Sequence, residues 1–241
     1  MLMLLAAFAG LVRGYSGFGF AMILALGLLS VRSPADVIPV VLLLDLLCSA
    51  GLWPRALRDA HGPLTIRLVA GMGLAVPLGV VMWAWLPGEW LAPLIASLCL
   101  IGGVLVLRQP PTLTVLRNTA LRAAFWAGLG SGLATTLASA GGPPLMLYLL
   151  RCGLSASALR ATAILFFAAS SGTALAAMGL SGLVGPTHLH LAATLLLPAL
   201  VGNLLGQWLH ARWEVCSLHR LVGALLVGLS AMSLWSSLAK P

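Results

Sequence analysis

The stretch Arg13–Met22, RGYSGFGFAM, interrupts the first long apolar segment of the chain. An arginine, three glycines and a serine stand where an ordinary membrane-spanning helix would continue with apolar residues. A second stretch, ASAGGPP at residues 138–144, breaks another apolar segment in the same way. Lipid cannot satisfy unpaired backbone N–H and C=O groups, so such breaks are tolerated only inside protein or beside a watery cavity. The two breaks therefore predict a membrane protein with two interrupted helices.

The composition of the 241 residues supports a place in the membrane. Hydrophobic residues make up 61% of the chain and charged residues only 7%, against about 25% charged residues in a soluble domain. The surplus of 13 Lys and Arg over 5 Asp and Glu would suggest nucleic acid in a soluble chain. Here the arginines cluster in short loops, which is the bias of cytoplasmic loops. We therefore expect a multi-pass protein in a lipid bilayer, without a nucleic-acid partner.

Eight segments are apolar over about the 20 residues that a membrane span needs. Two of them, residues 1–30 and 120–150, carry the breaks. The other six are uninterrupted: 35–53, 64–86, 90–107, 157–180, 188–209 and 217–238. The chain thus divides into two groups of four, at 1–119 and 120–241, each opening with a broken segment.

An internal repeat supports this division. A shift of 123 residues aligns glycines and tryptophans of the two groups: Gly19 with Gly142, Gly79 with Gly202, and Trp90 with Trp213. Such matches at one constant shift favour a duplicated unit. We expect the two membrane repeats to form one transmembrane domain.

The loop arginines bear on how the broken segments run. They flank four connections, at Arg55/Arg58/Arg67, Arg108/Arg117/Arg122, Arg151/Arg160 and Arg212/Arg220. If all eight segments crossed, the last two connections would face away from the first two, against the positive-inside rule. If each broken segment enters and returns, all four face the cytoplasm and the second repeat is inverted. We favour this all-α fold of two inverted repeats, a plan common in transporters; one long tilted helix over 120–150 is the alternative.

Each break also predicts a half-helix that begins near the middle of the membrane. Pro143 and Pro144 suit the first turn of a helix that runs to Leu150, and the first repeat would begin a similar helix near Phe20. Free N–H groups and the positive dipole ends would then converge on a site for a small anion. Close helix packing through small residues is the competing explanation. The candidate binding residues are the glycines and hydroxyls at this depth: Ser16, Gly17, Gly19, Thr135, Thr136, Ser139, Gly141 and Gly142.

Four other polar residues stand in apolar surroundings. Insertion of an arginine such as Arg13 into the membrane costs at least about 2.5–3.5 kcal/mol. Its side chain could attract the anion or act as a gate, or it could snorkel to the membrane surface or pair with an acid. Asp45 is a candidate for proton coupling or for pairing with Arg13. Asn203 and Gln207, one helical turn apart, could line the cavity, with Asn203 on the substrate and Gln207 in gating, or could make interhelical contacts.

The motifs of other function classes are missing from the sequence. GYSGF is not a G-x-S-x-G nucleophile elbow, and there is no HExxH, paired catalytic carboxylates or CxxC. His188 and His190 lack a third metal ligand. We therefore expect no enzyme activity, no cofactor and no metal. Transport would be driven by an ion gradient, with protons as a candidate coupling ion, by the membrane potential or by the substrate's own gradient. The alternative function is that of an anion channel. A homo-oligomer is a candidate assembly.

Two stretches carry a resemblance to a known family. GYSGFGFAMILALGL and SAGGPPLMLYLLRCGLSASALRATAILFF resemble the paired glycine-rich motifs of the TauE/SafE sulfite exporters. The second motif is the better match, at Gly141, Gly142, Pro144, Ala161 and Thr162. In the first, Phe18 and Phe20 stand where glycine is frequent, and Pro39 stands where the second repeat has Thr162.

The resemblance implies a function and a location. It implies export of sulfite or a small organosulfonate across the bacterial inner membrane, with the arginine-rich loops mostly cytoplasmic. It also adds Thr162 to the candidate binding residues.

Overall fold

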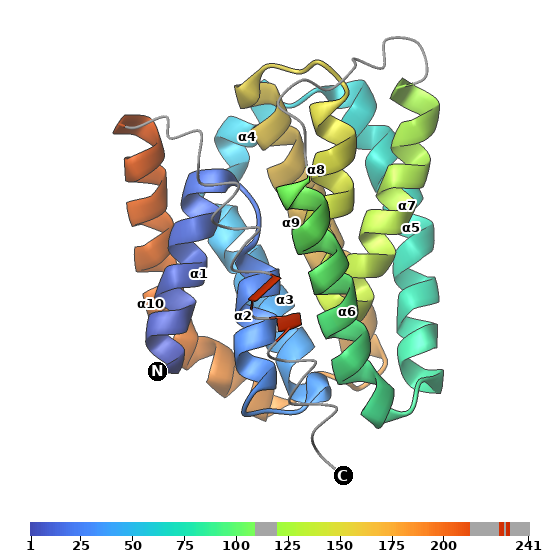
Figure 1. Cartoon of the computed structure of the whole chain (residues 1–241), viewed down its shortest axis with the longest axis vertical. Helices are drawn as coiled ribbons and strands as arrows, with labels where there is room; N and C mark the ends of the chain where they lie inside the picture. Colours follow the sequence, from blue (N-terminus) through green and yellow to red (C-terminus); the bar gives the residue numbers. More distant parts are fainter. Residues whose placement is uncertain (109–119, 213–226, 229, 232–241) are drawn as a thin grey trace.

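The computed structural model describes residues 1–108, 120–212, 227–228 and 230–231. Over the described residues the chain is helical, without strands (Figure 1). The predicted segment 217–238 lies almost wholly outside this part, as do Arg117, Trp213 and Arg220. The helices within residues 1–108 and 120–212 are α1 (Leu2–Ser16), α2 (Phe20–Leu29), α3 (Pro34–Ala50), α4 (Trp53–Asp59), α5 (Gly62–Trp85), α6 (Gly88–Leu107), α7 (Ala120–Ala138), α8 (Gly142–Leu150), α9 (Ala156–Leu180) and α10 (Pro186–Arg212).

Several helices are long and apolar enough to cross a membrane. Within the described residues these are Gly62–Trp83 of α5, Ser157–Leu180 of α9 and Pro186–Arg212 of α10. The pair α3 and α4 makes a fourth if it is counted as one span, bent by 72° at its break. The chain is therefore a multi-pass membrane protein, and α3, α5, α6, α9 and α10 coincide with predicted segments.

The two broken segments form helical hairpins. In Figure 1, α1 rises from the N-terminus at the lower end and α2 returns to that end, whereas α7 descends from the upper end and α8 returns upward. Gly17 and Gly19 make the first turn at φ 84° and 93°, conformations that favour glycine. The second turn passes through Ser139 at φ 52°, which is uncommon for a residue with a side chain.

Glycine residues allow close contact between the helices of two pairs. α1 lies along α10, and α5 lies along α7. A Cβ added at Gly10 would overlap the carbonyl of Ala199 on α10, and one at Gly71 would overlap the carbonyl of Phe125 on α7. Small residues thus let these backbones touch, as is usual between membrane helices.

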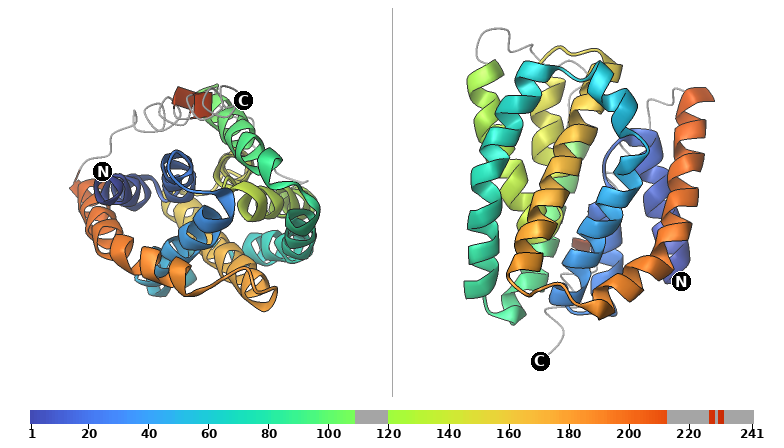
Figure 2. Two further views of the ribbon diagram at one scale, coloured as in Figure 1. Left: turned by 90° about the horizontal axis from the view of Figure 1, so that it is seen from below. Right: turned by 180° about the vertical axis from the view of Figure 1, so that it is seen from behind.

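Two further helices connect these pairs. α3 packs against both α10 and α9, and α9 packs against α5. The array therefore runs α1, α10, α3, α9, α5, α7, with α3 and α9 in the middle (Figure 2). This arrangement brings the side chains of α3 and α9 to the inner ends of both hairpins.

Most of the described arginines lie at one end of the molecule. This upper end in Figure 1 holds α4, the starts of α5, α7 and α9, and the ends of α6, α8 and α10. These elements and the residues next to them carry Arg55, Arg58, Arg67, Arg108, Arg122, Arg151, Arg160 and Arg212. Arg32, between α2 and α3, lies at the opposite end.

Candidate functional site

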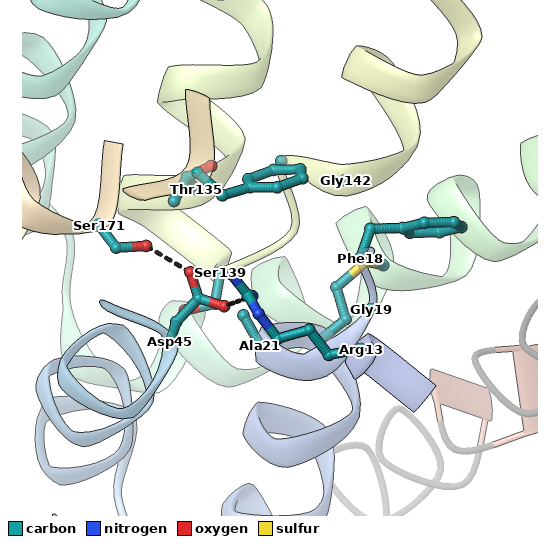
Figure 3. Close-up of a pocket in the computed structure, with 12 residues that line it drawn as sticks. Arg13, Phe18, Gly19, Ala21, Asp45, Thr135, Ser139, Gly142 and Ser171 are labelled. Atoms are coloured by element: carbon teal, nitrogen blue, oxygen red, sulfur yellow. Dashed lines mark hydrogen bonds and ion pairs between the residues drawn. The ribbon is translucent and has the colours of Figure 1, made fainter. Parts of the chain in front are cut away.

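A small cavity lies where the inner ends of the two hairpins meet (Figure 3). It leaves about 20 Å³ for the centres of water molecules, little more than the ~10–15 Å³ that a single water requires. It is too small in this conformation for an anion of several heavy atoms. The lining residues are Arg13, Phe18, Gly19, Ala21, Met22, Asp45, Thr135, Ser139, Gly141, Gly142, Phe167 and Ser171.

Two helix starts face this cavity. α2 begins after Gly19 and α8 after Gly141, and neither start carries a side-chain cap hydrogen bond. Both of these glycines line the cavity, together with Gly142. The first N–H groups of a helix have no acceptor within the helix, and its dipole makes this end partly positive. In α8 the donor is the N–H of Gly142, because Pro143 and Pro144 have none. The turn residues thus bring two partly positive helix ends to one place.

A buried ion pair forms one wall of the cavity. Arg13 pairs with Asp45 and also donates a hydrogen bond to the hydroxyl of Ser49. The second carboxylate oxygen of Asp45 accepts a hydrogen bond from Ser171, with 2.8 Å between the oxygens. Arg13 and Asp45 are only 2% and 3% exposed. Their charges cancel, and the network joins α1, α3 and α9.

Two polar atoms at this site have no hydrogen-bond partner. One is the Nε atom of Arg13, and the other is the hydroxyl of Ser139, which is 3% exposed. An unpaired buried polar group costs about 1–3 kcal/mol, so each atom favours a bound water or ligand group. The neighbouring Thr135 hydroxyl, in contrast, donates to the carbonyl of Ser131 at 2.8 Å.

The predicted site residues divide into two sets. The cavity brings together Arg13, Gly19, Asp45, Thr135, Ser139, Gly141 and Gly142. The remaining predicted residues do not line it: Ser16, Gly17, Thr136, Thr162, Asn203 and Gln207.

Residues of the second set are engaged elsewhere. The hydroxyl of Ser16 donates to the carbonyls of Val12 and Phe18. The side-chain amide of Asn203 donates to the carbonyl of Cys48 at 2.9 Å, beside the contact of α1 with α10.

Three more predicted residues make contacts away from the central cavity. The hydroxyl of Thr136 donates to the carbonyl of Gly132 within α7. The hydroxyl of Thr162 accepts a hydrogen bond from the backbone N–H of His61. Gln207 lines a different cavity, at the arginine-rich end.

Nearly the whole chain matches one known protein family. The family model described as sulfite exporter TauE/SafE matches residues 2–233. The chain belongs to the TauE/SafE family. No curated protein and no solved structure is significantly similar to it. Membership places the chain in a family of membrane transporters that export sulfite or related anions.

Some residues around the cavity of this TauE/SafE protein are not among those predicted from the sequence, although they lie on predicted segments. Ser49 and Ser171 bond to the ion pair, and Phe167 closes one side. The adjacent hydroxyls of Ser170 and Ser171, inside an apolar segment, were the available signal. Ser49 stands four residues after Asp45, which places it one helical turn away.

Proposed function

We propose that this protein exports a small anion, sulfite or an organosulfonate, by alternating access, and binds it in the cavity between the hairpins. The main support is the convergence of unused donors: the uncapped start of α2, the Gly142 N–H at the start of α8, the Ser139 hydroxyl and the Nε atom of Arg13. An oxyanion accepts hydrogen bonds from all of these groups, and charge-assisted bonds of this kind are the strong ones. Family membership supports the same class of substrate.

The small volume of the cavity supports a carrier over a channel. A space of about 20 Å³ does not admit an anion, so the surrounding helices must separate for the substrate to enter. Alternating access in a carrier provides such a movement of helices around the binding site. Saturable flux is the corresponding expectation, and unsaturable flux would favour the channel.

The proposal includes an inverted repeat of residues 1–119 and 120–241. The shift of 123 residues places α1 on α7 and α5 on α10, so that the packed pairs α1 with α10 and α7 with α5 are equivalent. The hairpins also open toward opposite ends (Figure 1). Both features are those of two units related by a two-fold axis in the membrane plane.

We further propose that the arginine-rich end faces the cytoplasm of a bacterial inner membrane. The support is the excess of arginine in the loops of that end, which is the usual mark of the cytoplasmic side. The substrate would then bind from the upper end in Figure 1 and leave from the lower end.

Asp45 is the proposed site of proton coupling. An anion that joined the neutral Arg13–Asp45 pair would give the buried site a net negative charge, which is costly inside a membrane. One proton on the Asp45 carboxylate restores neutrality and frees Arg13 for the anion. Anion and proton would then cross together, and the direction would follow the sum of their gradients.

The test is sulfite flux into proteoliposomes that contain the purified protein, with and without a pH gradient. Acetate and sulfate serve as competitors. We expect saturable uptake that is faster when the outside is the more acidic, and loss of this pH effect in Asp45→Asn. Uptake that stays the same with and without the protein would contradict the proposed function. An unchanged pH effect in Asp45→Asn would contradict the coupling role alone.

A further inference from the structure

A second cavity lies at the arginine-rich end, between α4, α9 and the end of α10. At about 420 Å³ it is far larger than the central one and large enough for a hydrated oxyanion. Its polar lining residues are Arg55, Asp59, Ser157, Arg160, Gln207 and His210. Two guanidinium groups and one carboxylate thus line this space. The formally charged groups around it therefore carry more positive than negative charge.

Arg160 separates this cavity from the first hairpin. Its Nη2 atom donates a hydrogen bond to the carbonyl of Gly14, the residue that follows Arg13 of the central site. Its Cγ atom lies 3.0 Å from the place that a Cβ on Gly17 would occupy. The side chain of Arg160 therefore covers the backbone of the first break on the side that faces the outer cavity.

The hydrogen bonding of Arg160 is incomplete. Its Nε atom is buried and has no hydrogen-bond partner. Among the residues that the structure describes, no carboxylate forms an ion pair with it. A guanidinium group forms stronger hydrogen bonds with an oxyanion than with a neutral carbonyl, and its planar fork fits two oxygens at once.

We propose that this cavity is an outer anion-binding site, in which Arg55 and Arg160 receive the substrate before it reaches the central cavity. The substrate class is a small oxyanion or sulfonate. An anion here draws Arg160 away from the Gly14 carbonyl and so uncovers the first break. The inference deepens the proposed transport function and rests on it, although the two can fail separately.

The first test measures binding of ³⁵S-labelled sulfite to the purified full chain in a Gly142→Leu background. The introduced leucine side chain would fill the central cavity, which Gly142 lines, so the remaining binding reports the outer site. We expect saturable binding to persist in Gly142→Leu and to disappear when Arg160→Gln is added. The matched control is Arg58→Gln, at an exposed arginine on α4 that does not line the cavity.

Two results of the binding test would overturn the outer site. One is that Gly142→Leu protein that still unfolds in a single cooperative transition binds no sulfite. The other is that Arg160→Gln and Arg58→Gln bind equally in that background. Either result leaves the central site and the transport function standing, because those are judged by wild-type flux.

A second test avoids the Gly142→Leu background. In flux measurements, loss of one charge-assisted contact in Arg160→Gln should raise KM for sulfite about tenfold. Arg160→Lys, which keeps the charge and loses the fork, should lie between Arg160→Gln and wild type. Arg58→Gln should keep the wild-type KM. An unchanged KM in Arg160→Gln, with normal transport, would contradict the proposal.

Discussion

At the first break the chain turns through Gly17 and Gly19, and the buried charge beside them, Arg13, is already neutralised by Asp45. At the second break the turn passes through Ser139, whose hydroxyl has no partner. The shift of 123 residues pairs Ser139 with Ser16, yet Ser16 donates to backbone carbonyls of its own turn. The two breaks thus share a backbone plan and differ in chemistry: the first supplies a compensated charge, and the second supplies an unused hydrogen-bond donor.

The largest effect is expected at the second break, from Gly142→Leu. A Cβ at this position would lie 3.4 Å from Phe18 and 3.8 Å from the sulfur of Met22, both ordinary contacts. The longer leucine side chain needs more room than this cavity has, so it should exclude the anion and overpack the turn, at a cost of about 1–3 kcal/mol in stability. We expect sulfite flux to fall to the level of empty liposomes, with a lowered melting temperature in a protein that still folds.

The matched control for this change is Gly130→Leu, at an exposed glycine on α7 with open space around it. It should transport like wild type. Gly141→Leu is a poorer test, because even a Cβ there would overlap the side chain of Thr135 and the backbone of Ser131. Normal transport by Gly142→Leu would remove the central cavity from the account.

At the first break, single changes of the ion pair should reduce stability most. Arg13→Gln or Asp45→Asn leaves one buried charge unpaired, which costs about 3–5 kcal/mol in soluble proteins. The double variant removes both charges and should recover much of this loss, but not transport. The free energies of unfolding of wild type, the two single variants and the double variant, measured in detergent, give the coupling energy of the pair. Additive losses in the double variant would show that the pair is not a unit.

A smaller effect should distinguish the two equivalent serines. Ser139→Ala removes a donor that is free for the anion, so KM for sulfite should rise about tenfold, which corresponds to about 1.4 kcal/mol. Ser16→Ala breaks bonds within its own turn, and should lower stability by about 1 kcal/mol with little change in KM. Flux kinetics and melting curves of both variants make the comparison. Equal KM values for the two variants would contradict the different roles of the two breaks.

The smallest expected change is a gain in stability from Ser139→Gly. The positive φ of Ser139 costs a residue with a side chain about 1 kcal/mol, and glycine removes this strain. The same change deletes the hydroxyl, so KM should rise as in Ser139→Ala. A melting temperature below that of Ser139→Ala would show that the turn is not strained.

Much of the helical plan could be predicted, because apolar runs of about 20 residues have few alternatives in a membrane. The starts of the half-helices were predicted near Phe20 and Pro143, and α2 and α8 begin at Phe20 and Gly142. Glycine and proline act on the local backbone, so their effect can be judged from neighbouring residues alone. The same reasoning placed both breaks beside one cavity.

The contacts between distant segments could not be predicted in the same way. Ser171 reaches Asp45 across 126 residues, and Arg160 reaches Gly14 across 146, because α3 packs against α9 and α10, and α10 packs against α1. Thr162 and Asn203 have the polarity expected of a site, yet they serve contacts between helices and loops. Polarity in an apolar segment indicates a buried partner, but the packing decides which partner it is.

The most direct test of the central claim is to locate the anion itself, using selenite as a heavier analogue of sulfite. Crystals of the protein grown with selenite would show the selenium by its anomalous scattering. We predict a peak between the starts of α2 and α8, within hydrogen-bond distance of the Ser139 hydroxyl and the Arg13 guanidinium. A protein that transports selenite, yet shows its selenium only at sites away from both hairpin turns, would contradict the account.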